Sequence, residues 1–293
     1  MKGLSKSEAI FKVVAHTFLI VFALMCIYPF IYAVSAALSG RTAFYTGQVV
    51  LFPVDLQFDA FLQIARTKRF WVCYANTLFI TFYGTIWSMG ISIMGAYALS
   101  KKRLVFRRVF NFYLVFTMWF SAGLIPQFLN YKATQNVFGT IGITDDKWLV
   151  VIAMGMTAYN IVLLRNAFEG VPSEIEEAAI VDGAKEFQLL SKVYVPMCKS
   201  AVATVTLFYG ISRWNGYFWA RTMIRNRNEW PLQVYIRDQL EEIASAEYEV
   251  LTAYAPNSLI YAMIVCAIVP IIIIYPYIQK YFAAGVNLGG VKE

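Results

Sequence analysis

The chain has 293 residues, of which 59% are hydrophobic and only 15% are charged, and its mean hydropathy is +0.56. Soluble domains carry about 25% charged residues, so this composition excludes an ordinary soluble protein. The formal charge of +7 gives no reason to expect nucleic acid as a partner, because the Lys and Arg residues lie in separate loops rather than in one patch. Four scattered cysteines and a single histidine argue against a disulfide framework or a zinc site.

Six stretches are long and apolar enough to cross a bilayer as helices, since a span needs about 20 mostly apolar residues. They are residues 13–38, 76–99, 109–130, 149–168, 200–220 and 257–282. The first stretch is longer than the apolar core of a cleavable signal, which has about 7–15 residues, so we expect a retained signal anchor. The sequence therefore predicts an all-α, polytopic membrane protein that forms a single lipid-embedded domain over residues 1–293.

The distribution of basic residues predicts the orientation of these spans. The loop after the second span, SKKRLVFRRV, holds five basic residues and no acidic ones, whereas the next loop holds only Lys132 and Lys147. The positive-inside rule places the basic loop in the cytoplasm. Six spans then put both termini in the cytoplasm, together with the loop of residues 169–198 between spans four and five.

That loop contains VPSEIEEAAIVDGAKEFQLLSKVYVPM (residues 171–197), which is unusually charged for this chain. Ser173 and Glu176 predict a capping box at the start of a helix. Gly183 predicts its end, since glycine adopts the left-handed conformation at low cost. A second helix is expected over 185–195 and should end at Pro196. An ordinary amphipathic loop at the lipid headgroups remains an alternative, although such helices usually carry Lys and Arg rather than acids.

The same loop resembles the EAA signature of the membrane subunits of ATP-binding-cassette (ABC) importers. The pattern is Glu177-Ala178-Ala179, three residues, Gly183, nine residues, Val193, one residue and Val195-Pro196. Two valines stand where Ile and Leu are usual, which keeps the apolar character. Further stretches are similar to the maltose-type sugar permeases, in the branch that imports oligo- and polysaccharides, including acidic ones such as alginate. These stretches are NTLFITFYGT, GAYALSKKRL, FSAGLIPQFL, SRWNGYFWA and YPYIQKYFAAGVNLGGVKE.

The resemblance implies a type I ABC importer permease fold in the inner membrane of a bacterium. It also implies a second homologous permease subunit, two ABC ATPase subunits that bind ATP and Mg, and an extracytoplasmic solute-binding protein. The chain itself has no G-x-x-x-x-G-K-[ST] motif, so we expect no cofactor and no catalytic residues in it. A transporter subunit rather than an enzyme is predicted.

The resemblance also assigns ATPase-coupling roles within the EAA loop. Glu177 is expected to make a charged contact, the two alanines a close-approach surface, and Gly183 a bend. The full set is Glu177, Ala178, Ala179, Asp182, Gly183 and Pro196. The tail of residues 285–293 either reaches between the ATPases or is a frayed terminus.

Polar and aromatic residues within the predicted spans are candidates for the substrate path, because such residues are costly in a membrane and often functional. They are Asn76, Asn160, Arg213, Trp214, Asn215 and Tyr217. Structural hydrogen bonds, an interfacial aromatic belt, or pairing of Arg213 with the second permease subunit are the alternatives. Two other functions stay open: a secondary transporter, disfavoured because Glu169 is essentially the only acid near a span, and an ABC importer permease for a non-sugar solute.

Overall fold

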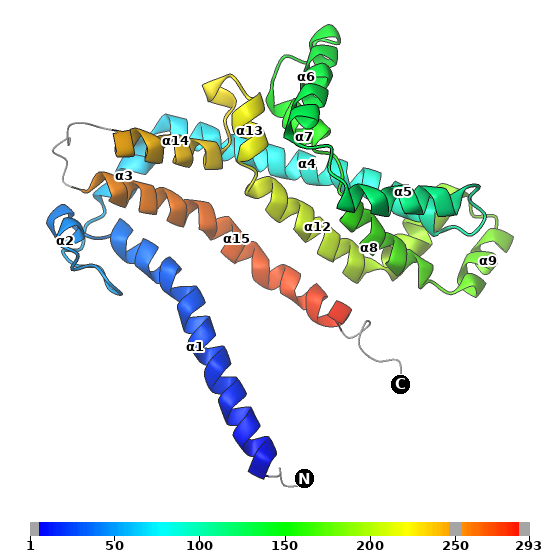
Figure 1. Cartoon of the computed structure of the whole chain (residues 1–293), viewed down its shortest axis with the longest axis horizontal. Helices are drawn as coiled ribbons and strands as arrows, with labels where there is room; N and C mark the ends of the chain where they lie inside the picture. The colour runs from blue at the N-terminus through cyan, green and yellow to red at the C-terminus, as the bar shows by residue number, and fades with distance from the viewer. Residues whose placement is uncertain (1–5, 246–253, 287–293) are drawn as a thin grey trace. The chain divides into compact units, whose positions relative to one another are not determined.

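The computed structural model describes residues 6–245 and 254–286, and within these residues the fold is all-helical (Figure 1). The described part contains no strand, only an isolated bridge between Ser39 and Leu56. The predicted all-α class is therefore confirmed. Most of the tail, from residue 287 onward, lies outside the described residues.

Three helices are long and apolar enough to span a bilayer: α1 (Lys6–Ala37), α4 (Lys68–Ser100) and α15 (Pro256–Val286). Two bent pairs of helices pass the same test only when each pair is taken together, α5 (Arg107–Trp119) with α6 (Leu124–Thr140), and α7 (Lys147–Ala153) with α8 (Ala158–Glu169). This gives up to five spans by length and composition. The stretch expected as the fifth span corresponds to α12 (Lys199–Trp214), which at 16 residues is shorter than the three long helices α1, α4 and α15.

The remaining helices are short and lie between these elements. They are α2 (Arg41–Tyr45), α3 (Asp59–Arg66), α9 (Ser173–Val181), α10 (Glu186–Gln188), the π-helix η1 (Leu189–Tyr194), α11 (Val195–Met197), α13 (Phe218–Met223), the 3-10 helix η2 (Arg227–Glu229) and α14 (Leu232–Ser245).

Residues 109–130 do not form one straight helix. The backbone leaves the helix at residues 120–123, and the axes of α5 and α6 differ by 116°. Gly123 has φ +86°, a conformation that glycine adopts without steric cost. Pro126 then falls in the first turn of α6, where its missing amide removes no helical hydrogen bond. Mean hydropathy alone indicates one continuous apolar span over residues 109–130. Gly123 and Pro126 nevertheless divide this stretch into two helices.

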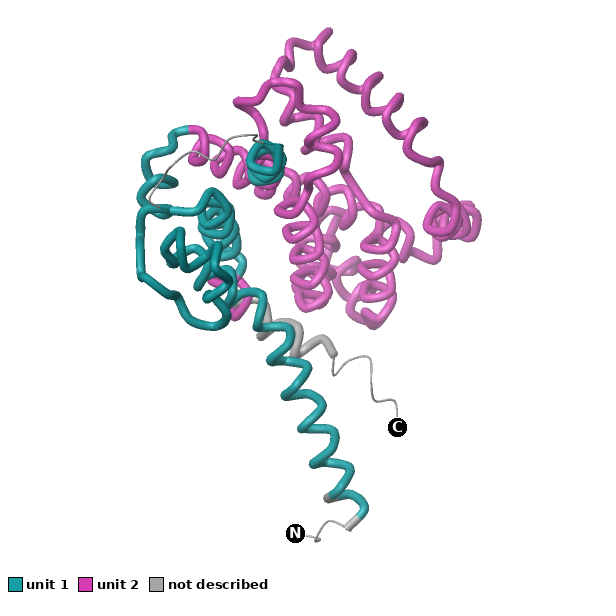
Figure 2. The backbone as a smooth tube through the Cα atoms, turned by 60° about the vertical axis from the view of Figure 1, so that its left-hand side comes forward, with its two compact units in different colours: residues 1–68, 236–271 teal, residues 69–235, 272–293 magenta. Residues whose placement is uncertain are grey.

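The chain forms two compact units, residues 1–68 with 236–271 and residues 69–235 with 272–293 (Figure 2). In the first unit, Ala36, Ala43 and Val49 form a small buried cluster. Tyr261 packs edge-on to Tyr32, with 5.5 Å between the ring centroids. Most of α1 lies outside this cluster, because no residue of its most apolar window is buried. An apolar helix without a protein covering suits contact with lipid.

The second unit holds the main core, formed by α4, α8, η1 and α12. The helix α4 turns small side chains to its neighbours, and Thr77, Ser88, Ser92 and Ala96 are fully or almost fully buried. Small residues allow membrane helices to approach closely. The larger residues Leu164, Phe168, Leu189 and Val205 fill the space between the facing helices. This core carries the EAA loop at one end.

Candidate functional site: the EAA loop and a broken span

The helix α9 ends at Gly183, as its sequence predicts. Gly183 has φ +82°, its amide donates to the Ile180 carbonyl at 2.9 Å, and the Ala184 amide donates to the Ala179 carbonyl at 2.9 Å. These two bonds make a complete Schellman motif, in which a left-handed residue satisfies the last carbonyls of a helix. The direction in which the chain leaves α9 therefore depends on Gly183.

The predicted capping box at the start of α9 is wrong. The helix begins one residue early, so Pro172 is the N-cap, and no side chain caps it. A capping box requires an amide on the N-cap residue, which proline lacks. The carboxylate of Glu176 is instead bound by Lys101 and Tyr194.

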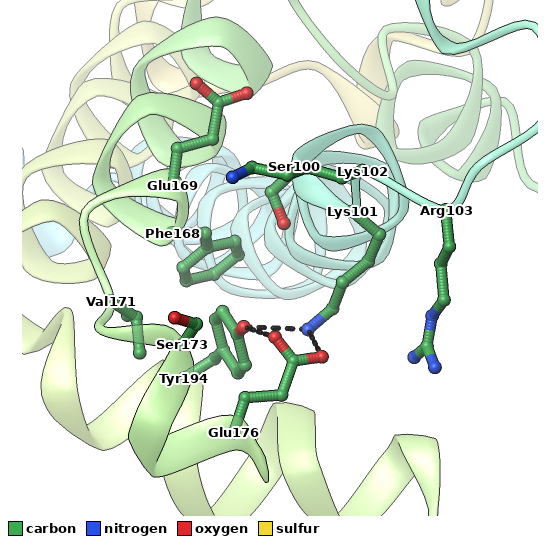
Figure 3. Close-up of a pocket in the computed structure, with 10 residues that line it drawn as sticks. All are labelled: Ser100, Lys101, Lys102, Arg103, Phe168, Glu169, Val171, Ser173, Glu176 and Tyr194. Atoms are coloured by element: carbon green, nitrogen blue, oxygen red, sulfur yellow. Dashed lines mark hydrogen bonds and ion pairs between the residues drawn. The ribbon is translucent and has the colours of Figure 1, made fainter.

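Lys101, Glu176 and Tyr194 form a closed triangle of hydrogen bonds, shown with dashed lines in Figure 3. Lys101 Nζ lies 2.6 Å from Glu176 Oε1 and donates to the Tyr194 hydroxyl at 2.7 Å. That hydroxyl donates to Glu176 Oε2 at 2.6 Å. The ammonium also lies over the Tyr194 and Tyr97 rings, 3.9 and 4.3 Å from their centroids, which favours a cation. Lys101 is 8% exposed and Tyr194 only 4%.

The charge states in this triangle follow from its surroundings. Burial alone raises the pKa of the Glu176 carboxyl, but the hydrogen bonds from Lys101 and Tyr194 outweigh burial and hold that pKa below its usual value. Burial, followed by the hydrogen bond to Glu176, raises the pKa of the Tyr194 phenol. At neutral pH the carboxylate is therefore charged and the phenol protonated. Because the pKa of Glu176 is lowered on folding, its contribution to stability is complete above the usual carboxyl pKa and is lost as the pH falls through the lowered value.

Two more ion pairs join the basic loop after α4 to acids near α9. Arg103 binds Glu186, which also accepts a hydrogen bond from the Tyr97 hydroxyl at 2.7 Å. Arg107 binds Glu169. A cavity of about 420 Å³ is lined by Lys101, Arg103, Glu169, Glu176 and Tyr194 together with the other residues drawn in Figure 3. The basic residues after α4, whose charge predicts the orientation of the spans in the membrane, therefore also form ion pairs with the EAA loop.

The outer face of α9 is open and partly apolar. Glu177, Ala178 and Asp182 are exposed, whereas Ala179 is half-buried and packs on the core. Val181 is 86% exposed. The sequence led us to expect one surface formed by both alanines. In the structure only Ala178 is exposed, so the two alanines do not share one surface.

A second large apolar side chain is exposed in the same loop. Phe187, in α10, is 75% exposed. Neither Val181 nor Phe187 was among the predicted coupling residues, although apolar residues in a charged extramembrane loop could have indicated them. Exposed large apolar side chains outside the spans mark a surface suited to a partner protein.

Pro196 does not end the second helix, contrary to the prediction. The π-helix η1 precedes it, and the amide of Val195 bonds to the Leu190 carbonyl five residues back. This wider turn shifts the hydrogen-bond register, so Pro196 lies inside the short helix α11, which ends at Met197, and a turn at Cys198 separates α11 from α12. The proline is exposed.

The candidate substrate-path residues lie in different surroundings. Asn76 is buried and donates to the Asn228 and Trp230 carbonyls at 2.7 and 3.2 Å, so it holds the loop before α14. Asn160 is buried in α8. Trp214 is buried edge-on to Tyr74, with 6.0 Å between the ring centroids.

Only two of the six candidates present surface to a ligand in this conformation. Asn215 is exposed and Tyr217 is partly exposed, whereas the other four are buried. A substrate-contact role for any of the six stays a prediction.

Arg213 closes the break between α7 and α8. The residue is 5% exposed, and its guanidinium donates to the Val150 carbonyl at 2.7 Å, to Ser88 Oγ at 2.9 Å and to the Met154 carbonyl. The two carbonyls belong to the end of α7, where a helix leaves carbonyls without partners and its dipole favours a cation.

The start of α8 is held from the other side of the break. The Thr157 amide donates to the Tyr209 hydroxyl at 3.1 Å, and that hydroxyl is 2.7 Å from Ser92 Oγ. The broken span is thus fastened at both ends by side chains of α4 and α12.

The family model described as "Binding-protein-dependent transport system inner membrane component" matches residues 88–288, which include both the basic loop and the EAA loop. The chain belongs to this family.

Two relatives of similar length match almost the whole of this inner membrane component. It is 33% identical over 289 residues to the polygalacturonan/rhamnogalacturonan transport system permease protein YtcP of Bacillus subtilis, covering 97% of this chain and 98% of that protein. It is 29% identical over 292 residues to the protein LplC of the same organism, covering 98% and 97%.

Two solved structures are similar to this inner membrane component. A chain from a bacterial ABC transporter involved in the import of the acidic polysaccharide alginate matches with 43% identity and a TM-score of 0.85, covering 96% of this chain and 100% of that one. A second, from an alginate ABC transporter in complex with an alginate pentasaccharide-bound periplasmic protein, matches at 14% identity with a TM-score of 0.65 and shows the shared fold. The resemblance based on the EAA pattern is confirmed, and a secondary transporter is not favoured.

Proposed function

We propose that this inner membrane component is the permease subunit of an ATP-driven importer of oligo- or polysaccharides, with acidic saccharides as the substrate class. The observation that carries this proposal is the 43% identity, over 96% of the chain, to a chain of an alginate importer. A relative named for polygalacturonan and rhamnogalacturonan transport, also acidic polymers, supports the same class. A non-sugar solute is the alternative.

The topology that fits this function has six spans, with α12 as the fifth and both termini in the cytoplasm of a bacterium. The two bent pairs count as one span each, and α1, α4 and α15 supply the others. This arrangement places the five basic residues after α4 and the acidic EAA loop on the same, cytoplasmic side. The ion pairs between these two segments support it, because paired segments must lie on one side of the membrane.

In the proposed assembly, the chain pairs with a second homologous permease subunit and receives solute from an extracytoplasmic binding protein. Two ABC ATPase subunits bind ATP and Mg on the cytoplasmic side. The exposed face of α9, with Glu177, Val181 and its C-cap Asp182, is the surface for one ATPase, together with the exposed Phe187 of α10. Closure of the ATPases then moves α9 and shifts the spans between inward-open and outward-open states.

Replacing Val181 by aspartate is expected to abolish copurification of the ATPase subunits with the permease. Val181 is 86% exposed here, so the change leaves the permease core intact while placing a charge in the interface. Pull-down from detergent-solubilised membranes measures the effect. Val50→Asp, at an exposed valine between α2 and α3 on the opposite side of the membrane in the proposed topology, is the matched control. Normal ATPase recovery with Val181→Asp would contradict the assignment of this face.

Short oligomers of uronic acids are expected to stimulate ATP hydrolysis by the reconstituted assembly, with the binding protein present, at least about tenfold more than neutral oligosaccharides of the same length. The measurement is phosphate release in proteoliposomes, with the assembly lacking its binding protein as the control. Equal stimulation by neutral oligosaccharides would contradict the acidic class. Stimulation only by a non-saccharide would replace the proposed function.

A further inference from the structure

We propose that Lys101, Glu176 and Tyr194 form a latch that fixes the coupling helix α9 to the end of α4, so that movement of α9 is transmitted to the core of the membrane domain. The inference rests on the proposed function, because α9 must be moved by a partner for a latch to matter. It assigns these three side chains as positioning residues, distinct from the exposed face that meets the partner.

The latch joins three elements that are distant in the sequence. Lys101 follows directly after α4, Glu176 lies in the middle of α9, and Tyr194 is the last residue of η1. Each side chain bonds to both of the others (Figure 3). A triangle of this kind fixes the separation of all three elements at once, which a single ion pair does not.

Burial makes the latch stronger than its neighbouring ion pairs. The side chains of Lys101 and Glu176 are 9% and 20% exposed, whereas those of Arg103 and Glu186 are 56% and 59% exposed. Exposed pairs are screened by water and contribute little, but breaking one partner of a buried pair leaves an uncompensated charge. The Lys101 ammonium also keeps its place over the Tyr194 and Tyr97 rings.

The rest of α9 makes a weaker attachment to the core. Among its described residues, none is fully buried, and Ala179 is the one counted among the partly buried residues packed on the core cluster. A short helix held mainly through a small side chain can rock when pushed. With the latch closed, a push on the exposed face of α9 reaches α4, whose small buried residues pack through the second unit. With the latch open, part of that movement is lost as local rocking of α9.

Two near-isosteric substitutions weaken the latch without removing bulk, and Tyr194→Phe removes two of its three hydrogen bonds while leaving the Lys101–Glu176 pair. Tyr194→Phe removes only the hydroxyl group and keeps the ring under the ammonium. Glu176→Gln removes the negative charge and keeps the shape. The matched controls are Tyr113→Phe in α5 and Glu242→Gln in α14, both at exposed positions.

The test uses the full transporter in proteoliposomes and measures the ATP hydrolysed per molecule of saccharide imported. Hydrogen exchange of the peptide covering residues 173–183 is measured in the same assembly. Both latch variants are expected to copurify with the ATPases, to exchange faster in this peptide, and to consume at least about threefold more ATP per imported molecule. The double variant is expected to show an effect smaller than the sum of the two single effects, because both changes disrupt the same Tyr194–Glu176 hydrogen bond.

The outcomes separate the latch from the function on which it rests. Faster exchange in both variants with an unchanged ratio of ATP to transport would overturn the latch as a transmission device. If the increases in ATP hydrolysed per imported saccharide were additive in the double variant, the two residues would not act through one triangle. If Glu176→Gln fails to assemble, Tyr194→Phe decides the question by the same two measurements. Lack of ATP-driven uptake by the wild-type assembly would overturn the proposed function itself, and the latch proposal with it.

Discussion

Replacing Gly183 by valine is expected to uncouple ATP hydrolysis from transport while leaving membrane insertion normal. Gly183 has φ +82°, and an L side chain in the left-handed region costs about 1–2 kcal/mol, more when it is β-branched. A free-energy cost of this size reduces the population of the native Schellman turn roughly 5- to 30-fold. The exit from α9 then changes, and with it the relation between the exposed face of α9 and the latch.

A series at this position separates backbone strain from crowding. A Cβ atom built on Gly183 meets no other atom within 4 Å, so crowding cannot explain an effect of alanine. We expect the ATP used per imported molecule to rise in the order asparagine, alanine, valine, because asparagine tolerates the left-handed conformation best. Gly90→Ala, where a Cβ also meets no atom within 4 Å but φ is helical, is the control. Wild-type coupling in Gly183→Val would show that the turn plays no part in transmission.

Replacing Arg213 by methionine is expected to destabilise the membrane domain by about 3 kcal/mol or more. Hydrogen bonds to charged groups contribute about 1.5–3 kcal/mol each, and this change leaves the Val150 and Met154 carbonyls at the end of α7 without their donor. The measurement is thermal unfolding of the purified permease in detergent. Arg108→Met, at an exposed arginine of α5, is the control and should unfold near the wild-type temperature.

The same variant decides between two roles for Arg213. If it fastens the broken span, Arg213→Met lowers thermal stability whether or not substrate is present. Gly84→Ala should have a milder effect of the same kind, because a Cβ there would lie 3.1 Å from Arg213 Cδ and Nε. If Arg213 instead binds an anionic saccharide, the variant would keep its unfolding temperature and raise the saccharide concentration needed for half-maximal transport. That second result would contradict the fastening role.

Local features of the EAA loop were predictable from the sequence because they depend on neighbouring residues. The end of α9 at Gly183 follows from the conformational freedom of glycine, and the all-helical class follows from the long apolar stretches. The spacing from Glu177 to Pro196 was enough to indicate the family. None of these inferences required contacts between distant segments.

Features that depend on distant contacts could not be read in this way. Glu176 looked like a capping residue because nothing in the sequence shows that Lys101, 75 residues earlier, lies beside it. Arg213 looked like a substrate ligand because its partners are mostly backbone carbonyls, which carry no sequence signal. The passage of a helix through Pro196 likewise depends on a π turn that local propensity does not predict.

The most direct test of the account is cross-linking from Val181→Cys in the assembled transporter. The native cysteines, Cys26, Cys73, Cys198 and Cys266, are first replaced by alanine. A photoreactive maleimide attached at position 181 is expected to give a covalent adduct with an ATPase subunit and to react only from the cytoplasmic side of the membrane. Labelling by an impermeant reagent from the outer side, with no ATPase adduct, would contradict the claim that α9 is the segment moved by the ATPases.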